Sequence, residues 1–304
     1  MASPADNRRG ILAMLGSVVV FLISDLCIRL VSSLPTGEIM ALRGVIASIA
    51  LLLACVLSGA LRRAGDIFRP LVLTRSGMEI AIAVLFINAL PYLPFANVNA
   101  TTLASSLVAT AIAAVTGVEQ VGARRWAALA IGFVGVIIVL RPDASAVHPA
   151  AIMLAVSTFC VGARDVLTRR IDPKTPTLLI SLASTLAVTT AGFLIGATVE
   201  RDWRWLTAHE TIMLAGSACA VAAGNVMIVH AFRGADVAVV APFRYTSLVF
   251  AIVAGFLIWR ETPDGWSLLG ALLIVGSGLY TIWRERVRAQ RAAIAAMSAG
   301  GGKT

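Results

Sequence analysis

Two acid–base pairs lie inside otherwise apolar segments of this chain. The stretch SDLCIRL places Asp25 four residues before Arg29, and the stretch RDVLTRR places Asp165 four residues before Arg169. Residues four apart share one face of a helix, so each pair can neutralise itself within its own helix. Alternatively, the residues of each pair form ion pairs with other helices, one set near each end of the protein, and these ion pairs break and re-form when the protein changes conformation. The sequence alone leaves both interpretations open.

The segments that carry these pairs belong in a lipid bilayer. The chain has 304 residues, of which 59% are hydrophobic and only 13% are charged, whereas soluble domains have about a quarter of their residues charged. A net charge of +9 does not indicate a nucleic-acid partner, because the basic residues are dispersed between apolar runs. The sequence therefore predicts an integral membrane protein with the lipid bilayer as a partner and no nucleic acid.

A helix needs about 20 apolar residues to cross the hydrocarbon. The apolar runs predict ten such spans, at residues 10–33, 38–60, 75–96, 98–117, 126–141, 149–170, 176–199, 210–232, 235–259 and 266–284. Ten is an even number, so both termini lie on one side. If that side is cytoplasmic, seventeen of the 25 Lys and Arg residues face the cytoplasm, four lie in outer loops and four within spans. The excess of positive charge predicts cytoplasmic termini for a multi-pass protein of the inner (plasma) membrane.

Five spans precede residue 149 and five follow it, so two homologous halves would cross the membrane in opposite senses. The repeated Asp–Arg pairs support homology, and so do Glu119 and Glu261, which follow the fourth and ninth spans at matching distances from small residues. We predict a first repeat at 1–145, a second at 146–287 and a flexible basic cytoplasmic tail at 288–304. The expected fold class is an all-α integral membrane protein with ten transmembrane helices in two inverted five-helix repeats.

These features resemble the drug/metabolite transporter superfamily, EamA type. The resemblance rests on DLCIRLVSSLPTGEIMALRG, on GVEQVGARRWAALAIGFVGVIIVLRP and on YTSLVFAIVAGFLIWRETPDGWSLLGALLIVGSGLY. It implies a ten-helix, two-repeat carrier with both termini inside. The family often has proline thirteen residues before each terminal Glu, where this chain has Ser106 and Leu248, and Gly just before that Glu, where this chain has Val118 and Arg260.

The resemblance implies a secondary transporter that works by alternating access. The first expectation is export of amino acids or related metabolites, and the alternative is uptake of a larger metabolite such as riboflavin or S-adenosylmethionine. A channel or a structural membrane protein is the alternative from another class. We expect a monomer or a homodimer.

Polar side chains in the middle of spans are the candidates for substrate binding, because an ionised group at that depth costs a few kcal/mol or more unless it is satisfied. Arg244 follows Pro242 in span 9, and we hypothesise that it holds an anionic group of the substrate. The residues expected to complete this pocket are Tyr245, Tyr92, Asn88 and Asn225. The alternatives are that Arg244 pairs with an acid from another helix, such as Glu79, or reaches the cytoplasmic face, and that the asparagines are hydrogen-bonding contacts between helices.

Gating or coupling is expected of the charged residues at the mouths and of side chains that titrate. This candidate set is Asp25, Arg29, Asp165, Arg169, Glu79 and His230. A proton-linked carrier needs a carboxylate or histidine that changes protonation during the cycle, whereas facilitated exchange needs none. The sequence does not choose between these two modes.

No enzyme motif is present in the sequence. There is no HExxH helix, no intramembrane protease core, no phosphate-binding loop and no dinucleotide fingerprint. The three histidines, His148, His209 and His230, are too far apart in sequence to indicate a metal site. We therefore expect no catalytic activity, no metal and no cofactor.

Overall fold

A computed structural model of the chain describes residues 4–116, 122–140, 148–168, 170–172, 174–200, 203–232 and 237–300. Within these ranges it leaves out the side chains of residues 4–5, 225–226, 228–230, 232, 237–238, 285–286 and 288–300. The described part is helical and contains no β-strand, which confirms the all-α fold class.

The α-helices are α1 (Pro4–Leu30), α2 (Thr36–Leu57), α3 (Pro70–Ala89), α4 (Phe95–Leu103), α5 (Ser105–Val115), α6 (Ala123–Leu140), α7 (Pro149–Thr168), α8 (Thr177–Thr198), α9 (Ala208–Phe232), α10 (Val237–Val240), α11 (Thr246–Trp259) and α12 (Gly265–Gly300). Three 3₁₀ helices, η1 (Ala60–Phe68), η2 (Leu90–Tyr92) and η3 (Ala241–Tyr245), connect or extend them. In the described residues nine segments are long and apolar enough to cross a membrane, so the chain is a multi-pass membrane protein. Helix α9, with 25 residues, has the length of a tenth span, and the count of ten stays a prediction.

Proline marks several of the helix starts. Pro70 is the first residue of α3, where its missing N–H costs nothing because the first turn of a helix has no internal acceptor. Pro35 and Pro176 precede α2 and α8 with extended backbone, which stops the preceding connector from continuing as helix. The last helix is longer than expected: the backbone of α12 remains helical to Gly300, within the segment for which the sequence predicts a flexible tail.

Two spans are interrupted, at positions that differ from the family's prolines. The span made of α4 and α5 is broken at Ala104, two residues before Ser106. The other interrupted span consists of α10, η3 and α11, and Pro242 lies in the 3₁₀ segment. Proline removes a backbone donor and disfavours a continuous α-helix, so this break follows the local sequence. No such residue accounts for the break at Ala104.

The helices form cross-half pairs. Helix α1 packs on α9, α3 on α7, α2 on α8, α4 on α11 and α6 on α12. Exchanging each helix with the one five spans along (α1 with α7, α2 with α8, α3 with α9, α4 with α11, α6 with α12) maps this set of pairs onto itself. A two-fold relation between halves would require this pattern, and the boundaries of the two repeats remain a prediction.

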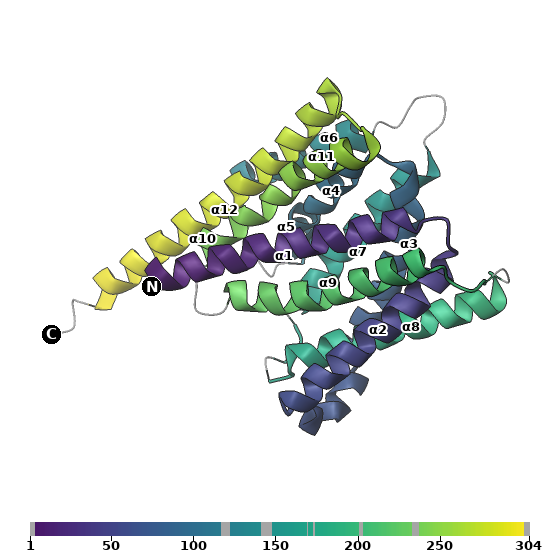
Figure 1. Cartoon of the computed structure of the whole chain (residues 1–304). Coiled ribbons are helices and arrows are strands. Elements are labelled where there is room, and N and C mark those ends of the chain that lie inside the picture. Colours follow the sequence, from purple (N-terminus) through teal and green to yellow (C-terminus); the bar gives the residue numbers. More distant parts are fainter. Residues whose placement is uncertain are drawn as a thin grey trace.

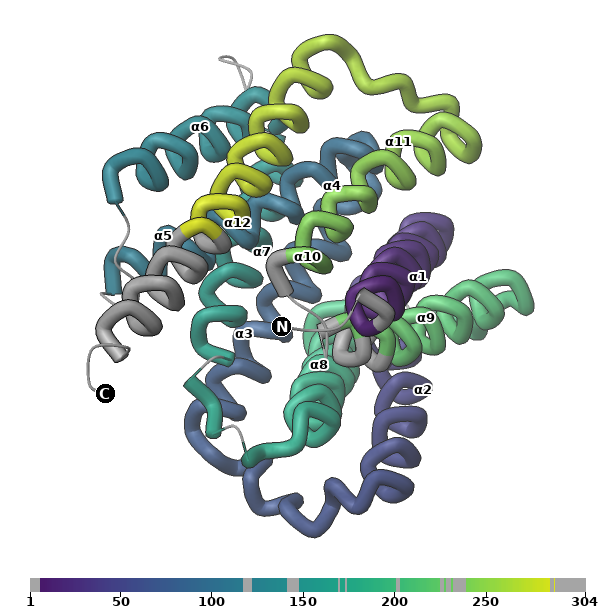
Figure 2. The backbone as a smooth tube through the Cα atoms, turned by 90° about the vertical axis from the view of Figure 1, so that its left-hand side faces the viewer, coloured from purple at the N-terminus to yellow at the C-terminus, as the bar shows by residue number. Residues whose placement is uncertain are grey.

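The two ends of the bundle can be named from the chain direction. Helix α1 begins on the left of Figure 1, and α12 returns to that side. We call this the terminal side. The opposite end, where α1 finishes at Leu30 and α11 finishes at Trp259, is called the loop side. The α2–α8 and α6–α12 pairs lie on opposite sides of the bundle in both views (Figures 1 and 2).

Glycines bring the backbones of two of these pairs into contact. A Cβ built on Gly192 of α8 would lie 2.5 Å from the backbone nitrogen of Ala41 and 2.8 Å from the carbonyl oxygen of Gly37, both on α2. In the α6–α12 pair, a Cβ on Gly135 would lie 2.7 Å from the carbonyl oxygen of Gly270. Because lipid offers no hydrophobic drive for helix association, such close packing is a main source of attraction between spans.

We expect Gly192→Leu to destabilise the protein by about 1–3 kcal/mol, because the obstructing atoms are backbone and cannot move aside. The matched control is Gly276→Leu on α12, where an added Cβ meets no atom within 4 Å. Thermal unfolding of both variants in the same detergent measures the difference. Equal melting temperatures would show that the α2–α8 contact is not tight.

Exposed charges join two connectors on the terminal side. Arg69 forms ion pairs with Asp66 at 2.8 Å and with Asp172 at 3.1 Å, linking η1 to the α7–α8 connector. The backbone N–H of Lys174, followed by the Arg69 guanidinium, lowers the pKa of the Asp172 carboxyl. The stabilisation is therefore present above the usual pKa of an aspartate and is lost as the pH falls through the lowered value. Solvent screening keeps such exposed pairs weak.

Candidate functional site

A cavity of about 490 Å³ lies between the two halves of the chain. Residues of α1, α2, α3 and α4 line it from the first half, and residues of α7, α8, α9, η3 and α11 line it from the second. Small-molecule sites in proteins have volumes of about 300–1,000 Å³. The cavity therefore has the size of a binding site for one metabolite.

Six ionisable side chains of the described residues line this cavity: Asp25, Arg43, Arg75, Glu79, Arg164 and Arg244. They come from α1, α2, α3, α7 and η3, so the arginines and carboxylates reach the same space from both halves. Charged side chains within spans are rare, face a protein interior or a water-filled cavity, and mark solute pathways. The set therefore identifies the cavity as the candidate functional site.

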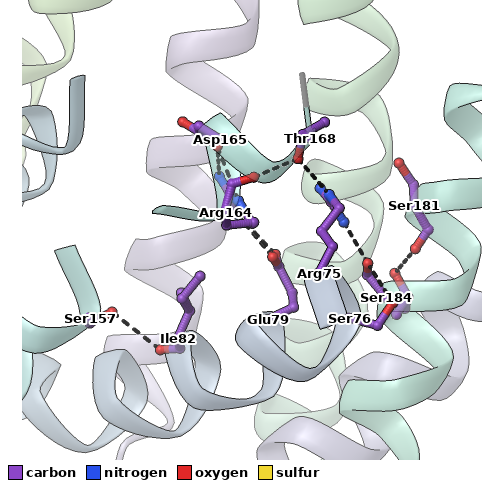
Figure 3. A network of polar contacts seen from close by, with 11 residues as sticks. Arg75, Ser76, Glu79, Ile82, Ser157, Arg164, Asp165, Thr168, Ser181 and Ser184 are labelled. Carbon is purple, nitrogen blue, oxygen red and sulfur yellow. Dashed lines mark hydrogen bonds and ion pairs between the residues drawn. The ribbon is translucent and has the colours of Figure 1, made fainter. Parts of the chain in front are cut away.

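Arg164 holds two carboxylates at one wall of the cavity (Figure 3). Its Nη1 donates to both oxygens of Glu79 on α3, at 3.2 and 3.0 Å. Its Nε and Nη2 donate to Oδ1 of Asp165, at 3.1 and 2.7 Å. The three side chains are partly buried, at 20%, 28% and 34% exposure for Arg164, Glu79 and Asp165. Glu79 and Asp165 are thus both committed to one guanidinium that joins α3 to α7.

Arg75 lies one turn before Glu79 on α3 but bonds to hydroxyl groups instead. Its Nε donates to Thr168 Oγ1 at 3.0 Å, and its Nη1 donates to Ser184 Oγ at 2.5 Å. Ser184 also shares a hydrogen bond with Ser76 at 3.2 Å (Figure 3). Because Glu79 turns toward Arg164, the Arg75 guanidinium is left with neutral hydrogen-bond partners beside the cavity.

Asp25 and Arg43 lie on another wall of the cavity, on α1 and α2. They interact electrostatically, but neither forms an ion pair with any residue in the described ranges. The Nη2 of Arg43 donates to Ser24 Oγ at 3.1 Å. Ser24 is fully buried and shares a hydrogen bond of 2.9 Å with Ser217 Oγ on α9.

Arg29 forms an ion pair beyond the cavity, toward the loop side. Its Nη2 and Nη1 donate to the two carboxylate oxygens of Glu261, at 2.5 and 3.2 Å, and its guanidinium lies 4.2 Å from the ring centroid of Trp259. Glu261 also accepts the backbone N–H of Phe95 at 2.8 Å. The Arg29–Glu261 ion pair therefore joins the ends of α1 and α11 to the start of α4, and Arg29 does not neutralise Asp25 within its own helix.

The turn that presents Glu261 closes the end of α11. Arg260 has a left-handed φ of 57°, its N–H bonds to the carbonyl of Phe256, and the N–H of Glu261 bonds to the carbonyl of Gly255. The bond from Arg260 to Phe256 is that of the αL type of helix C-cap, in which glycine normally occupies the left-handed position. Arg260 holds this position here, where the family pattern has glycine.

An apolar cluster seals the loop side around the Arg29–Glu261 ion pair. Its fully or almost fully buried members include Ile28, Val31, Leu34, Ile39, Leu90 and Phe95. The cavity-lining residues of α1 end at Asp25, whereas those of α3 and α8 begin near the terminal side, at Arg75 and Ser181. On α1 the cavity thus ends before the Arg29–Glu261 ion pair.

The structure brings together only part of the pocket predicted from the sequence. Arg244 lines the cavity and is exposed, and it forms no ion pair with any described carboxylate, Glu79 included. Tyr245 is buried and its hydroxyl shares a hydrogen bond of 3.3 Å with Ser106. Asn88 donates to the carbonyl of Val84 within α3, and the exposed Tyr92 ring packs on His148. Neither Asn88 nor Tyr92 is among the residues that line the cavity.

Of the remaining site residues predicted from the sequence, some lie at the cavity wall and others lie outside the residues that the structure describes. Asp25 and Glu79 line the cavity, and Asp165 touches it through Arg164. Arg169 and the side chains of Asn225 and His230 lie outside the described residues. Sequence reasoning missed Arg43, Arg75 and Arg164 as site residues. Arg43 and Arg164 could have been found from their position within spans, whereas Arg75 was counted with a loop because its span was placed to start there.

Residues 148–283 match the EamA-like transporter family. This match to the second half of the chain agrees with the resemblance to the EamA-type drug/metabolite transporters. The chain is also similar along most of its length to a solved crystal structure, with a TM-score of 0.63 at 17% identity, covering 91% of this chain and 98% of the other. At such low identity the similarity shows the fold alone.

The similar curated proteins are named as transporters. A riboflavin transporter of Rhizobium johnstonii is 34% identical over 184 residues, 57% of this chain and 56% of that protein. An S-adenosylmethionine uptake transporter of Rickettsia bellii is 27% identical over 168 residues, 55% of this chain and 57% of that protein. The chain thus spans somewhat more than half the length of these two relatives. The pseudopaline exporter CntI of Pseudomonas aeruginosa is 25% identical over 275 residues, 87% of this chain and 92% of that protein.

We expect Arg164→Gln to destabilise the protein more than Glu79→Gln does. The first change leaves two partly buried carboxylates close together without their cation, and breaking a buried pair in this way costs about 3–5 kcal/mol. The second change leaves Arg164 with Asp165. Thermal unfolding in detergent compares the two variants. If Glu79→Gln proves the more damaging, Arg164 is not the centre of this cluster.

Proposed function

We propose that the protein is a secondary transporter that moves a small organic metabolite across the inner membrane by alternating access. The observation that carries the proposal is the charged, metabolite-sized cavity lined by helices of both halves and closed toward one side. Transporters of this type hold their site between repeats and expose it to each side in turn. The transporter names of the similar proteins support transport rather than catalysis.

Amino acids or related metabolites are the substrates we favour, with export as the direction. The pseudopaline exporter, which aligns with most of this chain, supports export. Uptake of a larger metabolite is the second candidate, since the other two relatives are named for riboflavin and S-adenosylmethionine. The direction of net transport depends on solute gradients and on coupling rather than on the cavity. A ligand only shifts the balance between the carrier's conformations by the difference in its affinity for them.

The excess of Lys and Arg in the connectors of the terminal side supports a cytoplasmic location for both termini. With that orientation, the Arg29–Glu261 ion pair and the apolar cluster around it lie between the cavity and the outside. Arg244 remains our candidate for contact with an anionic group of the substrate, because it lines the cavity without an ion pair to a described carboxylate. Asp25, Asp165 and Glu79 remain candidates for gating or coupling.

Counterflow in proteoliposomes tests the proposal. Vesicles preloaded with one unlabelled compound from a panel of amino acids, S-adenosylmethionine and riboflavin should accumulate the same labelled compound in a saturable manner for at least one member. We expect Arg244→Gln to reduce that uptake by about tenfold or more, the effect of losing one charged hydrogen bond. Arg69→Gln, an exposed arginine outside the cavity, is the control. Flux that never saturates would identify a channel and overturn the proposal.

The closed loop side gives a second test. Glu261→Gln keeps an acceptor for the Phe95 N–H but removes the charge that pairs with Arg29, whose side chain is only 9% exposed. Leaving Arg29 buried without its charged partner costs about 3–5 kcal/mol in the conformation that is closed on the loop side. The population of that conformation should therefore fall. A cysteine at Asn99, which lines the cavity, should then react faster with an impermeant maleimide added from outside.

The control for this labelling is Glu210→Gln, which removes the partner of Arg204 on the same side without touching α1 or α11. The background lacks the four native cysteines. Equal labelling rates in the two glutamine variants would show that the Arg29–Glu261 ion pair does not control access from outside.

A further inference from the structure

Asp25 and Arg43 differ from the other acidic and basic neighbours in the cavity wall. They interact electrostatically but form no direct ion pair. Arg164 is bonded directly to Glu79 and Asp165. Asp25 and Arg43 both line the cavity and interact electrostatically, yet no ion pair connects them. Within the described part of the chain the Asp25 carboxylate accepts no hydrogen bond. Among the described residues, Asp25 therefore presents its carboxyl group to the cavity without a direct partner, and Arg43 presents a guanidinium whose one direct contact is the Ser24 hydroxyl.

The two charges are fixed in position by the helices that carry them. The Arg43 guanidinium is anchored by one hydrogen bond to Ser24, which uses one of its five N–H donors. Ser24 is held in turn by Ser217, whose hydroxyl also donates to the Ser24 carbonyl at 3.2 Å. Asp25 follows Ser24 directly in α1. The hydrogen bonds between α1, α2 and α9 thus hold the Arg43 guanidinium against Ser24, the residue that precedes Asp25 in α1.

Apolar side chains form part of the cavity wall next to Asp25 and Arg43 on their own helices. Leu22 and Met40 are buried and line it beside the two charges, together with Phe21. In such surroundings an unpaired charge is costly, and the interaction with a bound opposite charge is correspondingly stronger than in water. A ligand that carried only an anionic group would leave Asp25 unsatisfied, and a ligand that carried only a cationic group would leave Arg43 unsatisfied. One ligand with both groups satisfies both residues.

We propose that Asp25 and Arg43 bind the zwitterionic head of an α-amino acid, or of a larger metabolite that carries one. The ammonium group donates hydrogen bonds to the Asp25 carboxylate, and the substrate carboxylate accepts two from the Arg43 guanidinium, whose planar fork matches it. This inference rests on the proposed transport function and names the substrate class of its cavity. S-adenosylmethionine belongs to this class of compound, whereas riboflavin, which has no such head, does not.

Binding to purified wild-type protein provides the first measurement. The probes are the twenty common L-amino acids, S-adenosylmethionine and riboflavin, titrated by calorimetry in detergent. For the amino acid that binds most tightly, two analogues follow: the amine that lacks its carboxylate and the acid that lacks its amino group. Both analogues should bind about tenfold or more weakly than the parent, because each leaves one charge of the site unpaired.

Two variants then assign the groups. In Arg43→Gln the advantage of the parent amino acid over the amine analogue should shrink, since the carboxylate has lost its guanidinium partner on α2. In Asp25→Asn the deaminated acid should bind as well as the parent. Arg69→Gln and Asp172→Asn make the same chemical changes at an exposed ion pair and should keep the wild-type preference. The wild-type comparison of the three ligands stands even where a variant does not fold.

Analogues that bind wild-type protein as tightly as the parent would overturn the inference, and so would Asp25→Asn and Arg43→Gln variants that keep the full preference. Saturable counterflow of riboflavin without binding of any zwitterion in the panel would overturn the inference and leave the transport function standing. Absence of both binding and counterflow for every compound would overturn both.

Discussion

An ionised side chain in an apolar helix bundle must be matched by an opposite charge or by several hydrogen bonds, and this requirement organises the interior of the protein. Arg29 is matched by Glu261 and by the ring of Trp259. Arg164 is matched by Glu79 and Asp165, and Arg75 by hydroxyl groups. Each match joins helices that are distant in sequence, so the same contacts that make the charges tolerable also fix the positions of the spans.

Two kinds of contact hold the halves together, and they differ in how they can be broken. The glycine contacts of the α2–α8 and α6–α12 pairs bring backbone against backbone, and separating them forfeits dispersion with nothing to replace it. Ion pairs such as Arg29–Glu261 can exchange their partner for water once the site is wetted. A carrier that rocks one part against another needs both kinds, with close contacts where helices stay together and charge contacts where a mouth opens.

The charged residues of the cavity fall into two groups: those that join helices to each other and those that are available to bind a solute. Glu79, Asp165 and Arg164 satisfy one another and join α3 to α7. Asp25, Arg43 and Arg244 face the same space without an ion pair to any described residue. Since an interaction gains most where a group is otherwise unsatisfied, the second set is where a polar solute can gain binding energy. The similar proteins named for export and for uptake fit a scaffold whose substrate depends on a few such side chains.

The sequence by itself determined the solvent, the helical class and most of the spans, because an apolar run of about 20 residues is a local property. It also identified Asp25, Glu79, Asp165 and Arg244 as intramembrane charges of interest. Only the tertiary structure decided their partners. Arg29 lies four residues from Asp25 yet pairs with Glu261, which is 232 residues away, and Arg75 bonds across to α7 and α8 instead of to Glu79. Spacing along one helix shows which groups can meet, but which of them do meet depends on how separate helices pack, and that is a property of the whole bundle.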